Sequence, residues 1–219
     1  MSHEGRCTAG DARGEVLARI RAALVDVPRN AAEAPIPRDY ERERAEPRLV
    51  ELFAERVADY GAEVKRVERA RVSEAVARSC RELGLRRLVI AAGAPPEWRV
   101  ADAEVFDERW VNDRELDGVD GVISGCAVAI AETGTILLDG GPRCGRRAIT
   151  LVPDHHICIV EAEQIVALVP EAFARLESAV RERRAPITLI SGPSATSDIE
   201  LNRVEGVHGP RQLLVLVAA

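Results

Sequence analysis

Polar residues that could do chemistry gather in the second half of this chain. They form four short segments, and each segment interrupts or adjoins a short apolar run: 131–135, 153–156, 191–200 and 206–211. In an α/β protein, ligands bind at the loops that lie at strand ends, so four such loops in one half predict a single polar site. The first half of the chain has no comparable set of polar segments.

The first segment, Ala131–Thr135, separates two apolar runs and predicts the turn of a hairpin, with Gly134 taking the positive φ that a short turn demands. Glu132 lies at the tip, where partial burial would make its carboxylate a nucleophile or a base. An exposed turn carboxylate is an equally good interpretation. We take Glu132 as a candidate catalytic residue, and Thr133 and Gly134 as candidate ligand contacts.

The second segment contains Asp154, His155 and His156. If the two histidines begin a strand, their side chains point to opposite faces, so one metal ion could not easily bind both. His156 and Cys158 would share a face, but three different ligand types without a repeated spacing are weak evidence for a metal. We expect no metal here, and the histidines are better explained as loop residues hydrogen-bonded to the backbone. All three residues of the segment remain candidate ligand contacts.

The third segment follows an apolar strand and contributes Ser191, Gly192, Ser194, Thr196 and Asp198. Its hydroxyls and backbone amides could hold a carboxylate or a phosphate. The alternative is a Gly-Pro turn followed by a Ser or Thr that caps a helix. We favour binding, because the neighbouring segments indicate the same.

The last segment contributes His208 as a candidate general acid and Arg211 as a ligand contact, although Gly209 and Pro210 could simply fix a turn before the last strand. A further stretch, 140–147, is a near match to a phosphate-binding loop. Arginines stand at its lysine and hydroxyl positions, and an apolar run follows instead of a helix. NTP hydrolysis is therefore disfavoured, and a solvated loop is expected.

The composition excludes several classes of function. The net charge is −6, which disfavours nucleic acid as a partner, and the seven aromatic residues leave few rings for stacking on bases. The five cysteines are widely spaced and include no C-x-x-C pair, so neither a disulfide framework nor an iron–sulfur or zinc motif fits. The longest apolar run is far shorter than a membrane span, and a reducing cytoplasm is the expected location.

The spacing of apolar residues predicts an α/β fold. Helices are expected over 11–27, 48–60, 73–83 with Ser73 as its cap, and 164–180 with an interruption near Pro170. Strands are expected over 63–68, 88–91, 127–131, 135–138, 149–152, 157–160, 188–190 and 213–217. Their alternation implies a mixed, mostly parallel sheet flanked by helices, since parallel neighbours need a crossover. Four prolines between residues 28 and 47 predict a linker, so we expect a helical arm and linker over 1–47 and the α/β domain over 48–219.

Taken together, the polar segments resemble the LUD-domain family in residues and in order. The likeness covers about 48–219, is weaker before Val119, and rests on the stretches 125–136, 151–157, 190–200 and 206–211. It implies a fold similar to the ribose-5-phosphate isomerase and CoA-transferase group.

The resemblance also implies a function. It indicates a subunit that works beside two iron–sulfur proteins in oxidising L-lactate to pyruvate and that binds a small anion or its partners through the four loops. The chain has no cysteine quartet, so the electrons would be carried elsewhere, and no cofactor is expected. The alternatives are a stand-alone enzyme of the CoA-transferase or sugar-phosphate isomerase kind that uses Glu132, and a purely structural scaffold.

Overall fold

The computed structural model describes residues 9–26, 37–193 and 209–219. The chain divides into two compact units, Met1–Tyr40 and Glu41–Ala219. The smaller unit contains the helix α1 (Ala9–Ala23), which ends before the predicted residue 27 and is followed by a turn. Its apolar residues Val16, Ile20 and Leu24 follow a four-residue spacing and are 48–56% exposed. The predicted boundary at residue 47 stays a prediction.

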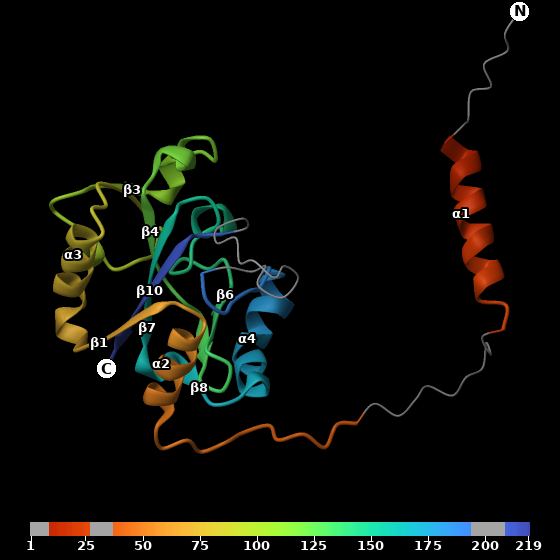
Figure 1. Ribbon diagram of the computed structural model, residues 1–219, viewed down its shortest axis with the longest axis horizontal. Coiled ribbons are helices and arrows are strands. Elements are labelled where there is room, and N and C mark those ends of the chain that lie inside the picture. Colours follow the sequence, from red (N-terminus) through yellow and green to blue (C-terminus); the bar gives the residue numbers. More distant parts are fainter. Residues whose placement is uncertain (1–8, 27–36, 194–208) are drawn as a thin grey trace, which may run out of the picture. The chain divides into compact units, whose positions relative to one another are not determined.

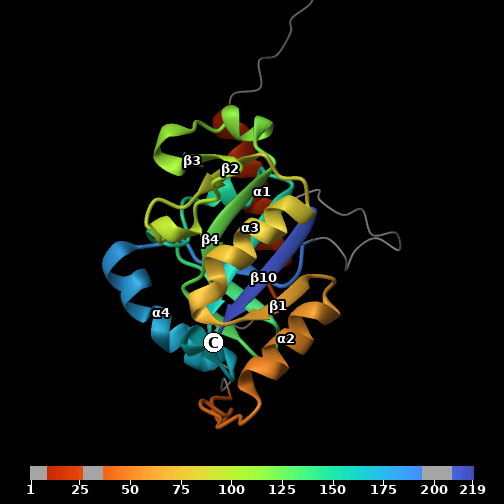
Figure 2. The ribbon, with the colours of Figure 1, turned by 90° about the vertical axis from the view of Figure 1, so that its left-hand side faces the viewer.

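The larger unit is built on a six-stranded, wholly parallel sheet (Figures 1 and 2). In spatial order its strands are β1 (Glu63–Val67), β10 (Gln212–Ala218), β7 (His155–Glu161), β4 (Gly121–Gly125), β2 (Arg87–Ile90) and β3 (Glu104–Asp107). The central strands are buried on both faces, which explains their continuous apolar sequences. The predicted parallel arrangement is confirmed.

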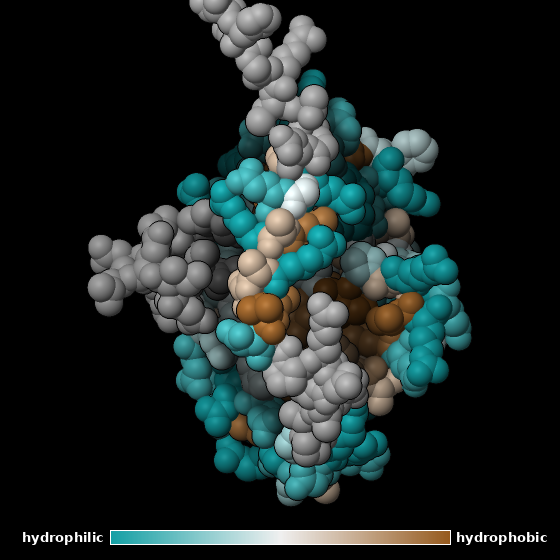
Figure 3. Space-filling model, turned by 90° about the vertical axis from the view of Figure 1, so that its right-hand side faces the viewer, coloured by the Kyte–Doolittle hydropathy of each residue, from teal (hydrophilic) through white to brown (hydrophobic). Residues whose placement is uncertain are grey.

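A second, mixed sheet has the order β8 (Ile165–Val166), β5 (Val128–Ile130), β6 (Thr135–Leu138) and β9 (Thr188–Ile190). Strands β5 and β6 form the predicted antiparallel hairpin, and Gly134 in its turn has φ +59°. Helix α4 (Val169–Arg183) covers this sheet through Ala172 and Leu176. A space-filling view from the right-hand side of Figure 1 shows small apolar areas between hydrophilic residues (Figure 3).

Two further helices complete the layers. Helix α2 (Leu49–Asp59) buries Phe53 and Val57 in one cluster with residues of both sheets. Helix α3 (Val72–Glu82) packs Val76 and Cys80 against the other face of the parallel sheet (Figure 2). From left to right, Figure 1 therefore shows α3, the parallel sheet, α2 with the mixed sheet, and α4. Short 3₁₀ turns connect these elements: Arg69–Arg71, Pro96–Trp98, Glu108–Trp110, Glu115–Gly118, Arg147–Thr150 and Ala162–Gln164.

Several predicted elements were wrong. Residues 149–152 are not a strand: Arg147–Thr150 form a 3₁₀ turn, closed by hydrogen bonds from Arg147 Nη1 to the carbonyl and hydroxyl of Thr150. The helix predicted from residue 164 begins only at Val169, with Pro170 in its first turn, where the missing N–H costs nothing. Helix α3 begins one residue before Ser73, which caps nothing, and strands β3 and β4 were not predicted.

Within the described residues, no helix is long and apolar enough to cross a membrane.

Candidate functional site

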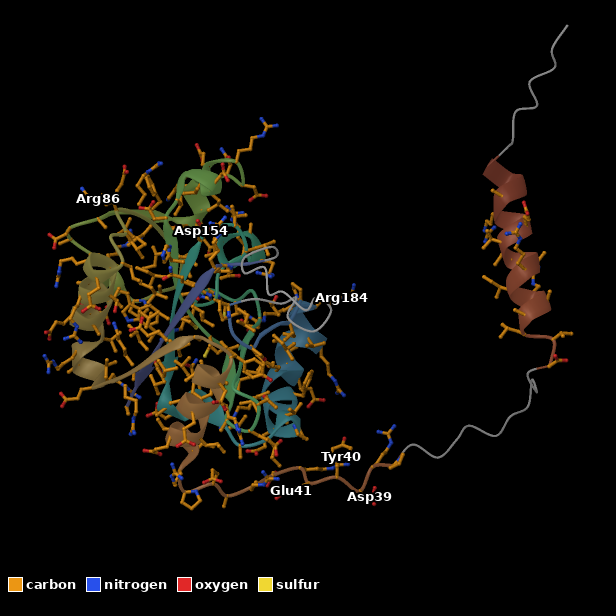
Figure 4. The ribbon with its side chains drawn as sticks, in the orientation of Figure 1. Asp39, Tyr40, Glu41, Arg86, Asp154 and Arg184 are labelled. Atoms are coloured by element: carbon orange, nitrogen blue, oxygen red, sulfur yellow. The ribbon has the colours of Figure 1, made fainter. Side chains whose placement is uncertain are left out.

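The predicted residues of the second and fourth segments meet at the amino-terminal edge of the parallel sheet. Asp154 and Arg211 immediately precede β7 and β10, which are neighbouring parallel strands. The Gln212 N–H donates to the Asp154 carbonyl at 3.1 Å, and Arg211 Nε lies 3.4 Å from Asp154 Oδ1. Figure 4 shows Asp154 at this end of the sheet. These residues enter the strands and do not leave them, so the edge is opposite to the one where ligands of open α/β sheets usually bind.

A cavity of about 240 Å³ opens at this edge. Its wall contains charged side chains and two histidines, together with apolar residues from the starts of the strands. The third segment reaches it through Pro193. Its lining consists of Gly61, Glu63, Leu83, His155, His156, Ile157, Pro193, Arg211, Gln212, Leu213 and Leu214.

The two histidines begin strand β7 and are not the loop residues that we favoured from the sequence, so their side chains point to opposite faces of the sheet. His155 is partly exposed, and its Nδ1 lies 3.1 Å from the Asp120 carbonyl. Since a carbonyl only accepts, Nδ1 carries the proton and Nε2 is left for a ligand. His156 is 1% exposed, and its Nε2 lies 2.8 Å from Ser124 Oγ. Burial and the nearby Arg147 charge lower the pKa of His156 to about 4, so it is neutral near pH 7.

Ser124 is a polar residue that the sequence reasoning missed. It lies inside the buried strand β4, and its only signal is a hydroxyl within an apolar run. A Ser–His hydrogen bond is typical of a nucleophile and its base, but Ser124 is 0% exposed and His156 1%. Substrate has no access to this hydroxyl, so the pair satisfies two buried polar groups and positions the start of β7.

The first and third segments lie side by side along α2. A chain of hydroxyls links them: Thr133 Oγ1 is 2.7 Å from Thr135 Oγ1, which is 2.8 Å from Ser191 Oγ. Both glycines touch the α2 backbone. A Cβ on Gly134 would lie 2.6 Å from the Arg56 carbonyl carbon. A Cβ on Gly192 would lie 2.7 Å from the backbone carbonyl oxygen of Tyr60, the residue that follows the last residue of α2. Glycine is required at both positions for close approach.

Glu132 lies at the hairpin tip, with its side chain 46% exposed and Oε1 3.0 Å from Arg44 Nη1. Its backbone N–H donates a hydrogen bond to the Ala167 carbonyl at 3.1 Å. This geometry fits the simpler interpretation, an exposed turn carboxylate in an ion pair. A catalytic role for Glu132 stays a prediction.

Four predicted residues lie outside the described part of the chain: Ser194, Thr196, Asp198 and His208. In the described part, His, Cys, Asp and Glu side chains form no group of three that could hold a metal ion.

The carboxyl edge of the parallel sheet is closed by the loop over 140–147. The Gly93 N–H donates to the Pro142 carbonyl at 2.7 Å, and the Gly125 N–H donates to the Arg143 carbonyl at 2.8 Å. The carboxylate of Glu108, 7% exposed, accepts two backbone N–H groups at 2.9 and 2.7 Å, the second from the loop. The loop is more buried than the solvated loop that was predicted, because it packs on the strand ends.

Comparisons with known proteins agree on the family. The LUD domain profile matches residues 43–218. Lactate utilization protein C of Deinococcus radiodurans is 45% identical over 96% of this chain and 97% of that protein. The protein of the same name from Halalkalibacterium halodurans is 28% identical over 80% and 81% of the two chains. A crystal structure of a DUF162 family protein from Deinococcus radiodurans has a TM-score of 0.68 at 39% identity, and the match covers 78% of this chain and 96% of that one. The match of the profile over most of the chain, together with these relatives, shows that the chain belongs to the LUD domain family.

Proposed function

We propose that this chain is a cytoplasmic subunit of a lactate-utilization system that oxidises L-lactate to pyruvate together with iron–sulfur partner proteins. The names of the relatives support a role in lactate utilization, and the 45% identical relative matches over nearly its full length. The α/β domain over 48–219 supplies the ligand-binding part, and the arm and linker before it form a separate part.

The single observation that carries ligand binding is the cavity at the amino-terminal edge, which both Arg211 and His155 line. A volume of about 240 Å³ suits a small metabolite better than a nucleotide. The Arg211–Asp154 pair joins two side chains that are 65% and 57% exposed, so it is weak and Arg211 can turn to a carboxylate. A guanidinium binds a carboxylate through two parallel hydrogen bonds, and His155 Nε2 can accept a hydrogen bond from a hydroxyl. A 2-hydroxy acid presents both groups.

Oxidation of lactate to pyruvate releases two electrons and two protons. Among the described residues, the cysteines are four separate, buried thiols: Cys80, Cys126, Cys144 and Cys158. We assign the electrons to the iron–sulfur clusters of the partner proteins, and to this chain the holding of the anion.

Thermal unfolding in the presence of L-lactate, pyruvate and acetate tests the ligand site. We expect L-lactate or pyruvate to raise the Tm of the parent chain, and a ligand at one hundred times its Kd to stabilise the fold by about 2.7 kcal/mol. Arg211→Gln and His155→Gln should lose this rise. Arg181→Gln is the matched control, because Arg181 is a 77% exposed arginine on α4 with one ion pair. An equal rise in Arg211→Gln and Arg181→Gln would contradict the site.

A reconstitution tests the subunit role. The purified chain, the two iron–sulfur proteins and their mixtures are assayed for L-lactate-dependent reduction of a dye. We expect activity only in the complete mixture. With Arg211→Gln, a higher concentration of L-lactate should be needed to reach half of the maximal rate. Lactate oxidation by this chain alone would overturn the proposal.

A further inference from the structure

A second cavity, of about 270 Å³, lies on the opposite side of the molecule from the amino-terminal edge, and the function proposed above does not use it. It opens between α4 and the loop that follows β6, next to Cys126 at the carboxyl end of β4. Strand β4 is one of the two central strands of the parallel sheet. Three arginines line the cavity, Arg143 from the loop and Arg175 and Arg183 from α4. The carboxyl side of the sheet is where ligands usually bind in this class of fold.

Arg143 is held in place before any ligand arrives. Its guanidinium lies over the Trp98 ring at 5.2 Å, and its Nη2 donates to Glu161 Oε1 at 2.8 Å. Among the described residues, Arg143 Nε is the one buried side-chain nitrogen or oxygen that has no hydrogen-bond partner. Leaving such a donor without an acceptor is unfavourable. Because Nε is buried, what Arg143 can offer an anion is the remaining N–H groups of its two terminal nitrogens.

Arg175 and Arg183 lie about two turns apart on α4 and bring two further guanidinium groups to the cavity. Arg175 Nη1 donates to the Glu163 backbone carbonyl at 2.7 Å, and no carboxylate pairs with it among the described residues. Arg183 pairs with the carboxylate of Asp139, which is 13% exposed. Burial alone would raise the pKa of Asp139, but the Gly141 N–H and Arg183 outweigh burial and lower it.

The charges at this cavity do not balance. Three arginines face two carboxylates, those of Asp139 and Glu161, which leaves an excess of one positive charge. An anion would remove it.

We propose that this cavity is a second anion site, and that its ligand is a small tetrahedral oxyanion of the phosphate class, either free phosphate or the phosphate group of a metabolite. Arginines that line the cavity from the loop and from two positions on α4 can donate to oxygens that point in several directions. A planar carboxylate would be satisfied by a single arginine. The site goes beyond the lactate role and does not rest on it.

Calorimetric titration of the full chain with inorganic phosphate, at constant ionic strength set with chloride, tests the proposal. We expect saturable binding, and at least a tenfold loss of affinity in Arg175→Gln, which removes a side chain with no carboxylate partner. Arg181→Gln, six residues further along α4 and paired with Glu177, should bind like the parent. Arg183→Gln is a second variant, and it should weaken binding as well.

The outcomes separate this site from the one at the amino-terminal edge. Arg211→Gln should keep phosphate binding while it loses the response to lactate, and Arg175→Gln should do the reverse. Tighter binding of a phosphate monoester than of phosphate itself would identify a metabolite as the source. Absence of saturable phosphate binding, or equal binding by Arg175→Gln and Arg181→Gln, would overturn the proposal, even if the lactate response is intact.

Discussion

Gly134 offers the sharpest test of how the hairpin turn is positioned. Its φ of +59° is a conformation that L-residues rarely adopt, and a Cβ there would lie 2.6 Å from the Arg56 carbonyl carbon and 2.8 Å from its oxygen. Gly134→Ala therefore meets two separate costs, a backbone strain and a steric clash with helix α2. Because the contact is with backbone, no side-chain rotation can relieve it.

The magnitude follows from a comparison with Gly84, which ends α3 with φ +68° and has no atom within 4 Å of its would-be Cβ. In Gly84→Ala, left-handed strain of about 1–2 kcal/mol is partly offset by about 0.4–1 kcal/mol of lost freedom in the unfolded chain, a net cost of about 1 kcal/mol. Gly134→Ala adds an overpacking cost of about 1–3 kcal/mol, for a total of about 2–4 kcal/mol.

Urea unfolding of the parent and the two variants, followed by circular dichroism, measures both free energies. The slope with urea should stay the same in all three, because the surface exposed on unfolding does not change. If Gly134→Ala loses no more stability than Gly84→Ala, the close packing of the turn on α2 is wrong, and the glycine would be explained by φ alone.

Three further predictions concern the buried and exposed ionisable groups. The pKa of His156 is lowered to about 4, so between that value and its ordinary 6.5 the unfolded chain binds more protons than the folded one. The free energy of unfolding should therefore fall as the pH drops through this range, by at most about 3.4 kcal/mol. Urea titrations at pH 7 and pH 5 should show this loss in the parent and not in His156→Gln. Burial raises the pKa of four thiols, those of Cys80, Cys126, Cys144 and Cys158. In a Cys7→Ser variant, a thiol reagent at pH 8 should label these four only after unfolding, and rapid labelling of the folded variant would refute their burial. Glu132→Gln breaks a half-exposed ion pair with Arg44 and should lower stability by less than about 1 kcal/mol without affecting growth on L-lactate; loss of growth with an unchanged unfolding curve would instead establish a catalytic Glu132.

The elements that could be predicted are those whose signal is local. Helix α2 was expected over 48–60 and is found over Leu49–Asp59, because Phe53 and Val57 repeat at helical spacing and both are fully buried. The hairpin was expected because a glycine separates two apolar runs. The strand expected at 149–152 failed because its apolar residues are too few to distinguish a strand from a turn, and the side chains of Arg147 and Thr150 close the turn.

Part of the grouping at the amino-terminal edge could be predicted from the sequence, but the edge itself could not. Sequence order brings Asp154, His155 and Arg211 to strand ends, but it does not say whether they enter or leave the strands. That depends on where the apolar runs begin, and both β7 and β10 begin directly after these polar residues. Ser124 was not predicted, because the sequence does not distinguish a serine inside a buried strand from any other small core residue. Its partner, His156, is thirty-two residues away in the sequence.

The two edges of the parallel sheet differ in a way that determines how each could bind an anion. At the carboxyl edge, the backbone N–H groups of Gly93 and Gly125 already donate to carbonyls of the loop over 140–147. An anion there would therefore bind the arginine side chains beside α4. At the amino edge, the Gln212 N–H is likewise bonded to Asp154, which leaves Arg211 and His155 as the donors and acceptors. Among the residues that the structure describes, neither place offers a nest of free amides of the kind that holds phosphate in nucleotide-binding loops. In this part of the chain, recognition at both edges rests on a few cationic side chains, and for this reason single arginine substitutions, each with an exposed arginine as its control, can separate the two sites.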